Sequence, residues 1–389
     1  MLTALCTGSN SLVADQRWKI YKFGGSSLAD ATCFRRVAGL VLELDDERIG
    51  VVVSAMGGMT DALINLANIA EQGDDGFNAE LNTIGERYVT TARELLQGEN
   101  KGDYLVSILD AWSEDAADVI DVLKAIALVK SAPERSRDVV AGYGELWSAR
   151  LLAAFLAQES PQRGGTWLDA RTIITVRDSE LGPSVLWEES QAKFDANVKS
   201  DFRGIVVVTG FIAADEEGLQ TNLGRNGSDH SAAIIAKLSN AAELSIWTDV
   251  DGVMSADPNR VPEAQVIDRL SYSEAMELAY FGANVIHPQT LGPAIENDIP
   301  VIIRNSYKPE HPGSRIEAAS MPSKNIKGIT AIGGIALVNL EGSGMIGVPG
   351  TADRLFAALK VAGVSVTLIS QASSEHSICI AVPEVAAKE

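Results

Sequence analysis

A lysine followed by two glycines and two serines supplies groups that can bind phosphate. The stretch Lys22-Phe23-Gly24-Gly25-Ser26-Ser27 ends an apolar, β-prone run that begins at Trp18. In a strand-to-helix turn, glycines let backbone N–H groups approach an anion closely, and the helix end and the lysine add positive charge. A plain Gly-Gly turn beside a surface lysine explains the same residues equally well, so this stretch alone leaves both interpretations open.

A second candidate site places an arginine between two glycines. The residues are Leu223-Gly224-Arg225-Asn226-Gly227-Ser228-Asp229-His230, between a predicted strand and a predicted helix. A guanidinium group binds carboxylate or phosphate through two parallel hydrogen bonds. In the simpler interpretation, Ser228 or Asp229 caps the following helix. Capping does not explain the arginine between the glycines, so we favour a binding site.

A third segment carries several aspartates after a predicted strand. It reads Trp247-Thr248-Asp249-Val250-Asp251-Gly252 and is followed by Asp257-Pro258. An EF-hand requires glycine at the sixth loop position, and Gly252 is only the fourth residue counted from Asp249, which excludes that site. Two interpretations remain: a strand that ends in an Asp-Gly turn, or a nucleotide pocket at the carboxyl end of a strand.

Glu145 follows the glycines of Gly142-Tyr143-Gly144, where we expect a helix to begin. The helix dipole favours a solvated acid in a first turn, and the same carboxylate is equally suited to a substrate ammonium group. Other catalytic patterns are missing from the sequence. It has neither a P-loop nor a Gly-x-Gly-x-x-Gly turn after the first strand, and no metal-ligand spacing among its four histidines, His230, His287, His311 and His376.

Alternating strands and helices must position these residues. Residues 18–23 predict a strand, Asp30 is placed to cap the next helix, and residues 50–55 predict a strand buried on both faces. Such alternation is typical of an α/β fold with a mainly parallel sheet flanked by helices. Further strands are expected at 205–213, 219–223, 244–248 and 301–304, and further helices at 61–70, 145–156 and 231–238.

Composition divides the chain into segments. We expect a disordered tail at 1–16, an α/β domain at 17–306 with a helical elaboration at 71–137, and a Pro- and Gly-rich linker at 307–328. Beyond it, residues 329–389 predict the order strand, helix, strand, strand. This is the beginning of a ferredoxin-like βαββαβ module, cut short before its second helix and fourth strand.

The 389 residues include 32 Lys and Arg against 52 Asp and Glu, which gives a net charge of −20. A chain this acidic repels nucleic-acid phosphates and anionic membrane surfaces. No apolar run reaches the roughly 18 residues of a membrane span. Three widely separated cysteines fit a reducing compartment, which we expect to be the cytoplasm, with a plastid as the alternative.

A polyanionic nucleotide binds such a protein only where local groups outweigh the overall field. Lys22, Arg225, two glycine-lined helix starts and Mg²⁺ are groups of the right kind. Phosphoryl transfer needs positioning and charge neutralisation rather than a protein nucleophile. The absence of an obvious nucleophile or base therefore fits kinase chemistry.

Together the motifs resemble those of the aspartate kinases in the amino-acid kinase family, and in detail the kinase half of the bifunctional aspartate kinase–homoserine dehydrogenases. Asn226, Asn284 and the stretch 369–376 favour the bifunctional type. Residues 329–389 resemble the first ACT module of the family, which binds free amino-acid end products. The resemblance runs in order over residues 17–318 and is carried by the segments 22–27, 51–60, 144–150, 223–229, 248–258 and 280–288.

The resemblance implies transfer of a phosphoryl group from ATP to L-aspartate, which gives ADP and 4-phospho-L-aspartate, the first step toward lysine, threonine, methionine and isoleucine. Lys22 would neutralise the transferring group, and Asp229 would orient Lys22. Glu145 would face the amino group of aspartate, and Arg225 would face a carboxylate. The implied substrate residues are Thr60, Glu145, Arg225, Asn226, Gly227 and Ser228.

The resemblance also implies a nucleotide site. Asn259 and Asn284 stand where many members of the family carry a positive charge, and Arg260 is placed to compensate for the first. No residue is assigned as a metal ligand. The implied nucleotide residues are Lys22, Phe23, Gly24, Gly25, Ser26, Thr248, Asp249, Met254, Asp257, Asn259, Arg260, Asn284 and Val285.

By the same resemblance, threonine is the expected effector and lysine the second choice, and pairing of ACT modules predicts a homodimer or a larger assembly. Two alternatives stay open. One is another enzyme of the same fold, such as a glutamate 5-kinase or an N-acetylglutamate kinase, against which the ACT-like tail argues. The other is a non-catalytic amino-acid sensor, against which the presence of Lys22, Arg225 and Asp229 argues.

Overall fold

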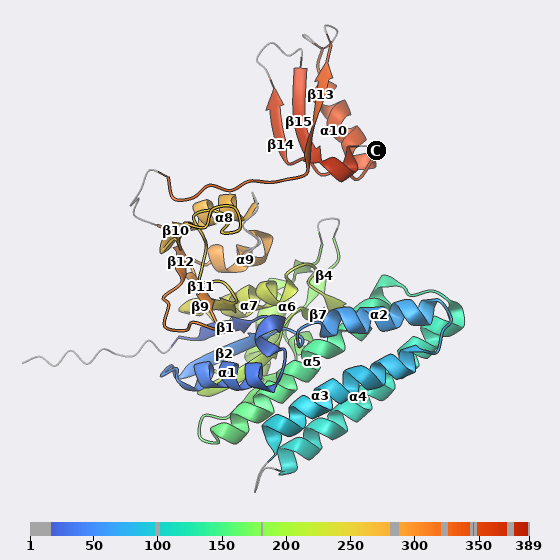
Figure 1. Cartoon of the computed structure of the whole chain (residues 1–389), viewed down its shortest axis with the longest axis vertical. Helices are drawn as coiled ribbons and strands as arrows, with labels where there is room; N and C mark the ends of the chain where they lie inside the picture. The colour runs from blue at the N-terminus through green and yellow to red at the C-terminus, as the bar shows by residue number, and fades with distance from the viewer. Residues whose placement is uncertain are drawn as a thin grey trace, which may run out of the picture. The chain divides into compact units, whose positions relative to one another are not determined.

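The computed structural model describes residues 17–97, 102–179, 182–280, 288–319, 326–342, 345, 348–371 and 377–387. The expected tail at residues 1–16 lies outside these ranges. The chain divides into a large unit that ends at Ile329 and a small unit that begins at Thr330. Figure 1 shows the helices and strands of both units.

An eight-stranded sheet is the middle layer of the large unit. Neighbouring strands run parallel except for one antiparallel pair, β11 with β12. The predicted, mainly parallel sheet is therefore confirmed. In spatial order its strands are β10 (Arg269–Ser271), β12 (Ser314–Glu317), β11 (Val301–Asn305), β9 (Glu243–Thr248), β1 (Lys19–Phe23), β2 (Arg48–Val53), β6 (Gly204–Thr209) and β3 (Thr166–Leu168).

Helices and hydrophobic residues cover both faces of the sheet (Figure 1). Along β2, Val51 and Val53 join the core on one face and Val52 joins the core on the other, which explains why the strand is apolar throughout. The first core includes α1 (Ala31–Leu42), α2 (Met59–Glu71), α3 (Phe77–Leu96), α4 (Gly102–Val129) and α5 (Glu134–Glu159), and the second includes α6 (Trp187–Asn197), α7 (Gly227–Leu238), α8 (Tyr272–Tyr280) and α9 (Pro288–Ile295).

Local sequence signals explain several element boundaries. Asp30 caps α1 as predicted, because its Oδ1 accepts a hydrogen bond of 2.9 Å from the Cys33 backbone N–H. Short elements connect the main layers: η1 (Gly25–Leu28), η2 (Ala170–Thr172), and the two antiparallel pairs β4 (Val176–Arg177) with β5 (Ser184–Val185) and β7 (Ile212–Ala214) with β8 (Gln220–Asn222).

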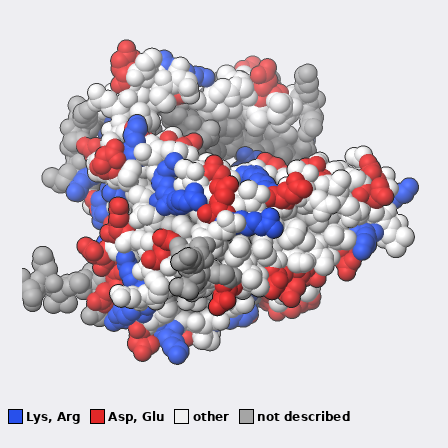
Figure 2. Space-filling view, turned by 60° about the horizontal axis from the view of Figure 1, so that its bottom comes forward, with Lys and Arg blue, Asp and Glu red and all other residues white. Residues whose placement is uncertain are grey.

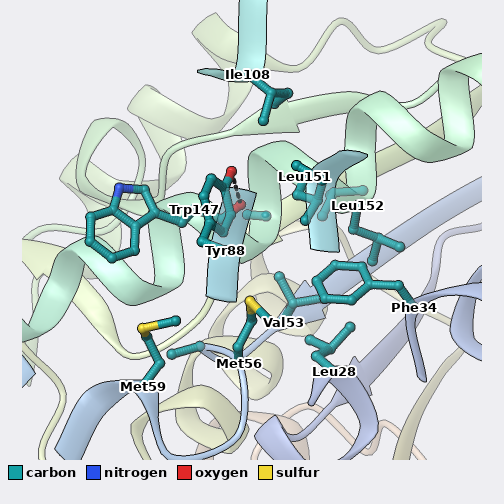
Figure 3. Packing of buried hydrophobic residues seen from close by; sticks show 14 of the residues in the cluster. Leu28, Phe34, Val53, Met56, Met59, Tyr88, Ile108, Trp147, Leu151 and Leu152 are labelled. Atoms are coloured by element: carbon teal, nitrogen blue, oxygen red, sulfur yellow. Dashed lines mark hydrogen bonds between the residues drawn. The ribbon is translucent and has the colours of Figure 1, made fainter. Parts of the chain in front are cut away.

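A polar cluster locks α5 to the hairpin of α3 and α4. Trp147 Nε1 donates a hydrogen bond of 3.0 Å to Asp115 Oδ2, and Arg150 pairs with the same oxygen at 2.5 Å. The Tyr88 hydroxyl donates to the Trp147 carbonyl at 3.2 Å, within a dense apolar core (Figure 3). Burial raises the pKa of Asp115, although Arg150 opposes the shift. Loss of either charged partner would leave the other ion buried and uncompensated.

Three predicted boundaries differ from the structure. The helix expected to start at Glu145 begins at Glu134, because its glycines serve packing rather than a turn. The strand expected at 205–213 is broken between β6 and β7, where Phe211 adopts a positive φ of 67°. The segment 307–328, expected to be a linker, contains β12, which alternates buried and half-buried residues against β11.

The small unit has the predicted order of strand, helix, strand, strand. One face of its antiparallel sheet buries Ile378, Ile380 and Val382 against the helix, whereas Leu337 on β13 remains 72% exposed. This is a partial ferredoxin-like module, as expected. In spatial order the strands are β13 (Ile335–Glu341), β15 (Ser377–Pro383) and β14 (Leu368–Gln371), with α10 (Thr351–Val361) between β13 and β14 in the chain and η4 (Glu384–Ala386) at the end.

Among the described residues, α5 is the helix that is long and apolar enough to cross a membrane by length and composition. However, 78% of that window is buried inside the protein. Its apolar character is therefore explained by the core of the large unit.

We expect Leu151→Ala in α5 to destabilise the large unit by about 2–5 kcal/mol, because it removes a fully buried side chain and leaves a cavity. The matched control is Leu128→Ala in α4, where the side chain is 86% exposed and the expected change is within about 0.5 kcal/mol. Urea unfolding followed by tryptophan fluorescence measures both. Equal losses of stability in the two variants would contradict the packing described here.

Candidate active site

One cavity at the carboxyl ends of the parallel strands collects many of the residues singled out in the sequence. Its volume is about 300 Å³. Open α/β sheets bind ligands at this edge, where the turns after the strands meet. The lining residues are Lys22, Gly24, Gly25, Ser54, Ala55, Met56, Gly57, Gly58, Thr60, Asp61, Glu145, Asn226, Gly227, Ser228 and Asp229.

An ion pair between β1 and α7 forms one part of the cavity wall. Lys22 Nζ lies 2.7 Å from Asp229 Oδ1, and both side chains are mostly buried. α7 begins at Gly227 after Asn226, which has a positive φ of 54° and makes no side-chain cap. Neither Ser228 nor Asp229 is thus the N-cap, and Asp229 in the first turn faces Lys22 instead. The pair holds the lysine ammonium group at the cavity.

Glu145 brings a buried carboxyl group to the same cavity. The residue is 2% exposed, and its Oε2 makes no hydrogen bond within the described part of the chain. Burial raises the pKa of this carboxyl to about 8, although hydrogen bonds from the backbone of Glu145 and Ala55 oppose the shift. The retained proton adds stability that is fully present below the unfolded pKa of 4.5 and is lost as the pH rises through about 8.

Glycines explain how α5 comes close enough to place Glu145. A Cβ on Gly144 would lie 2.9 Å from the Cβ of Ala55, in the turn after β2, and a Cβ on Gly142 would collide with the side chain of Gln220. The expectation of a solvated acid at a helix start is therefore wrong. Glu145 lies in the middle of a long buried helix, and its glycines permit close packing against the turn that lines the cavity.

Hydrogen bonds from serine side chains join α5, the turn after β2 and α7 around the cavity. Ser148 of α5 donates to the Ser54 carbonyl at 2.6 Å, and Ser54 Oγ donates to Ser228 Oγ at 2.9 Å. Because Ser228 accepts this bond, its own hydroxyl proton is available to a ligand. These bonds fix the end of β2 relative to α5 and α7, which carry Glu145 and Asp229.

The turns after β1 and β2 touch backbone to backbone. A Cβ on Gly25 would lie 2.9 Å from the Ala55 carbonyl oxygen, and a Cβ on Gly57 would lie 3.1 Å from the Gly25 oxygen. A side chain at Gly25 would therefore force the two turns apart, and one at Gly57 would be a tight fit. Gly24 and Gly25 line the cavity, whereas Ser26 is exposed outside the lining, and Phe23 is a core residue that stacks on Trp247.

Arg225 does not line the cavity. It is exposed in the turn directly before Asn226, which does line it, and no ion pair of Arg225 is found among the described residues. The turn brings Asn226, Gly227, Ser228 and Asp229 to the cavity together, whereas the guanidinium group stays at the surface.

The segment after β9 lies at the same edge of the sheet but outside this cavity. Thr248 and Met254 are half-buried, and the predicted nucleotide residues Asp249, Asp257, Asn259 and Arg260 are exposed. Asp257 Oδ1 accepts a hydrogen bond from the Asn259 backbone, and Arg260 lies 3.7 Å from Asp257. Asn284 and Val285 fall outside the described residues.

Six lining residues were not predicted as site residues, namely Ser54, Ala55, Met56, Gly57, Gly58 and Asp61. The signal for them is present in the sequence, because Ser54-Ala55-Met56-Gly57-Gly58 follows a strand that is apolar throughout. A glycine pair after such a strand indicates a turn at the functional edge of the sheet as clearly as the one after β1 does.

The charges around the site are local rather than part of a large basic patch. Figure 2 shows acidic and basic side chains interspersed over the face that it draws. Among the described residues, no group of three His, Cys, Asp or Glu side chains is arranged to hold a metal ion. The ammonium group of Lys22 is thus the cation that this cavity offers to an anionic ligand.

Comparison with known proteins gives relatives over nearly the whole chain. The bifunctional aspartokinase/homoserine dehydrogenase 1 of Arabidopsis thaliana, a chloroplastic protein, is 42% identical over 376 residues, which cover 94% of this chain and 40% of the relative. Chloroplastic aspartokinase 2 of the same plant is 32% identical over 369 residues, 93% of this chain and 65% of the relative. The chain thus spans about two fifths of the length of its bifunctional relative.

Solved structures agree with these relatives. Escherichia coli aspartokinase III in complex with aspartate and ADP superposes with a TM-score of 0.77 at 28% identity, covering 94% of this chain and 78% of that one. The same enzyme in complex with lysine and aspartate gives a TM-score of 0.74. Residues 338–389 match the ACT domain, and residues 17–305 match the amino acid kinase family. The chain therefore belongs to the amino acid kinase family.

Proposed function

We propose that the chain is an aspartate kinase, which converts ATP and L-aspartate to ADP and 4-phospho-L-aspartate. The observation that carries the proposal is one cavity lined by both the Lys22–Asp229 ion pair and the buried carboxyl of Glu145, whose Oε2 has no partner among the described residues. A cation suits the transferring phosphoryl group, and an acid suits the ammonium group of an amino acid. The aspartokinase relatives support the same activity.

The reaction requires little covalent chemistry from the protein. A β-carboxylate oxygen of aspartate attacks the γ-phosphorus, the bond from that phosphorus to the bridging oxygen of ADP breaks, and ADP leaves with the electron pair. Aspartate is already ionised at neutral pH, with a pKa of about 3.9, so no general base is required. Lys22 would neutralise charge on the phosphoryl oxygens, and Asp229 would hold Lys22 in place.

Glu145 would select the amino acid. When a substrate ammonium group enters, the carboxyl gives up its proton and forms a buried ion pair in place of an isolated acid. Ser228 would donate its free hydroxyl proton to a carboxylate of the substrate. Thr60, Asn226 and Gly227 complete the proposed aspartate site.

Arg225 would join this site only after a side-chain movement, because its guanidinium group is exposed outside the lining.

ATP would lie between the turn after β1 and the segment after β9. Gly24, Gly25 and Ser26 would hold phosphate oxygens through backbone N–H groups. Thr248, Asp249, Met254 and Asp257 would border the nucleoside, and Arg260 would add charge beside Asn259. Mg²⁺ would enter with the ATP phosphates, which supply most of its ligands in such sites, and would neutralise charge in the transition state.

The small unit would carry regulation. We infer a free amino acid as the effector, threonine before lysine, and a dimer or larger assembly formed through the ACT-like module, whose exposed sheet residues on β13 and β14 would pair. The chloroplastic relatives favour a plastid over the cytoplasm as the compartment.

The most direct test of the proposed function is phosphoryl transfer to aspartate, trapped with hydroxylamine as the hydroxamate. Glutamate and N-acetylglutamate serve as competing acceptors. We expect product with aspartate alone. Turnover of glutamate without aspartate would favour another enzyme of the same fold, and ligand binding without any turnover would favour an amino-acid sensor.

We expect Lys22→Met to lower kcat by about 100–1000-fold, because it removes the cation that neutralises the transferring group. Lys19→Met is the matched control. Lys19 belongs to the same strand but does not line the cavity, and its Nζ lies 2.9 Å from Asp46 Oδ1. Coupled ADP release measures both variants. Wild-type turnover in Lys22→Met would remove the lysine from the mechanism.

The aspartate KM should depend on the ionisation of Glu145. Because ammonium binding needs the carboxylate and the empty-site pKa is about 8, we expect KM to fall by about tenfold per pH unit up to that pH and to level off above it. Glu145→Gln should give a high KM that is constant between pH 6 and 9. The control Glu86→Gln changes an exposed acid on α3 and should keep the wild-type profile. A pH-independent wild-type KM would argue against this role.

A further inference from the structure

We propose that residues 305–308, which we call the brace, position the nucleotide side of the active site, and that the Ser306 hydroxyl is the positioning group. The inference rests on the proposed function, because it takes the turn after β1 and the segment after β9 as the parts that hold ATP. The brace begins at Asn305, the last residue of β11, and its residues belong to neither the aspartate set nor the nucleotide set given above.

Ser306 connects these two parts directly. It is fully buried, and both its backbone N–H and its hydroxyl donate to the Thr248 carbonyl, at 2.9 and 3.2 Å. Its Oγ also lies 3.2 Å from the Oγ of Ser27, which is 1% exposed. Since the one hydroxyl proton of Ser306 goes to Thr248, Ser27 is the donor of the second bond. One buried hydroxyl thus bridges the two nucleotide-binding parts.

The other brace residues hold the segment after β9 further along. Asn305 Nδ2 donates to the Asp249 carbonyl at 3.3 Å and to Asp251 Oδ1 at 2.5 Å. Lys308 Nζ pairs with the other oxygen of Asp251 at 2.9 Å. These bonds fix the backbone of the segment in which the nucleotide residues Thr248 and Asp249 lie.

On its other side, the brace contacts the elements after β1. The Arg36 guanidinium of α1 lies 4.2 Å from the centre of the Tyr307 ring, in cation–π geometry. Ser27 belongs to η1, the turn that directly follows Gly24. The sheet ladder pairs β1 with β9 only as far as Phe23 and Trp247. Beyond the ladder, the Ser306 hydroxyl bonds to both turns, to the Ser27 hydroxyl and to the Thr248 carbonyl.

Loss of the bridge should therefore affect nucleotide binding more than aspartate binding. Ser306→Ala leaves the buried Ser27 hydroxyl without its acceptor and frees the turn after β1, for which we expect a loss of nucleotide affinity of about fivefold. On the aspartate side, Glu145 and Ser228 make no hydrogen bond to the brace among the described residues, so the KM for aspartate should not change. If Ser306 only filled the core, its replacement would lower stability and would not affect nucleotide binding more than aspartate binding.

The test uses wild type, Ser27→Ala, Ser306→Ala and the double variant. The matched control is Ser190→Ala, because Ser190 is equally buried and its hydroxyl also bonds the backbone of a distant residue, Thr175, away from the cavity. Calorimetric titration with ADP alone measures nucleotide affinity without any turnover. Coupled ADP release then gives the KM for ATP and for aspartate, and thermal unfolding compares the stability of all variants.

We expect each single variant to weaken ADP binding and raise the ATP KM by about fivefold, with the aspartate KM within about twofold of wild type. The double variant should resemble Ser306→Ala rather than the sum of the two single variants, since both changes remove the same bond between Ser27 and Ser306. Ser190→Ala should bind ADP normally. Ser27→Ala keeps the bond from Ser306 to Thr248, so it remains informative if Ser306→Ala does not fold.

Unchanged ADP affinity in the single variants, additive losses, or equal increases in both KM values would overturn the proposal. Wild type that binds ADP but does not phosphorylate aspartate would contradict the proposed function alone, because the ADP titrations still decide the role of the brace. Active wild type with unaffected variants would contradict the brace alone. Wild type that does not bind ADP would contradict both.

Discussion

Burial of the Glu145 carboxyl is the constraint on which the site depends. An acid with an unpartnered oxygen in a low-dielectric environment is costly, and the chain keeps it there with a pKa raised to about 8. The surrounding structure holds the acid in place, since α5 is packed closely against the turn after β2 through Gly144 and bonded to it through Ser148. A buried acid with a strongly shifted pKa is typical of a position that binds a ligand of opposite charge.

The sheet and the helices of the large unit also position the charged groups of the site. β1 lies between β2 and β9, and α7 covers the face toward which Lys22 points, so that the ion pair with Asp229 forms at the edge where the strands end. On the other face, the cluster of Asp115, Trp147 and Arg150 anchors α5 one turn beyond Glu145. Although the protein has a net charge of −20, its cavity thereby presents the Lys22 ammonium group to an anionic ligand and the buried Glu145 carboxyl to a cationic group.

Much of this arrangement was accessible from the sequence, and the failures have physical causes. Apolar runs that end in glycine pairs predicted β1 and β2, and Asp30 predicted the start of α1. The same rule misplaced Glu145, because a glycine within a helix can serve close packing as well as a turn, and the sequence does not tell the two apart. It also failed at β12, a short strand that follows Pro312 and Gly313 within the segment predicted to be a linker. The position of Arg225 outside the cavity depends on how the turn before α7 packs in the folded protein. No local sequence pattern predicts it.

The central claim is that an amino-acid ammonium group displaces a proton from Glu145. Isothermal titration of aspartate at pH 7, repeated in buffers of different ionisation enthalpy, measures this exchange directly. With an empty-site pKa of about 8, the account predicts release of close to one proton for each aspartate bound, and none for Glu145→Gln. Aspartate binding to the wild type without proton release would contradict it.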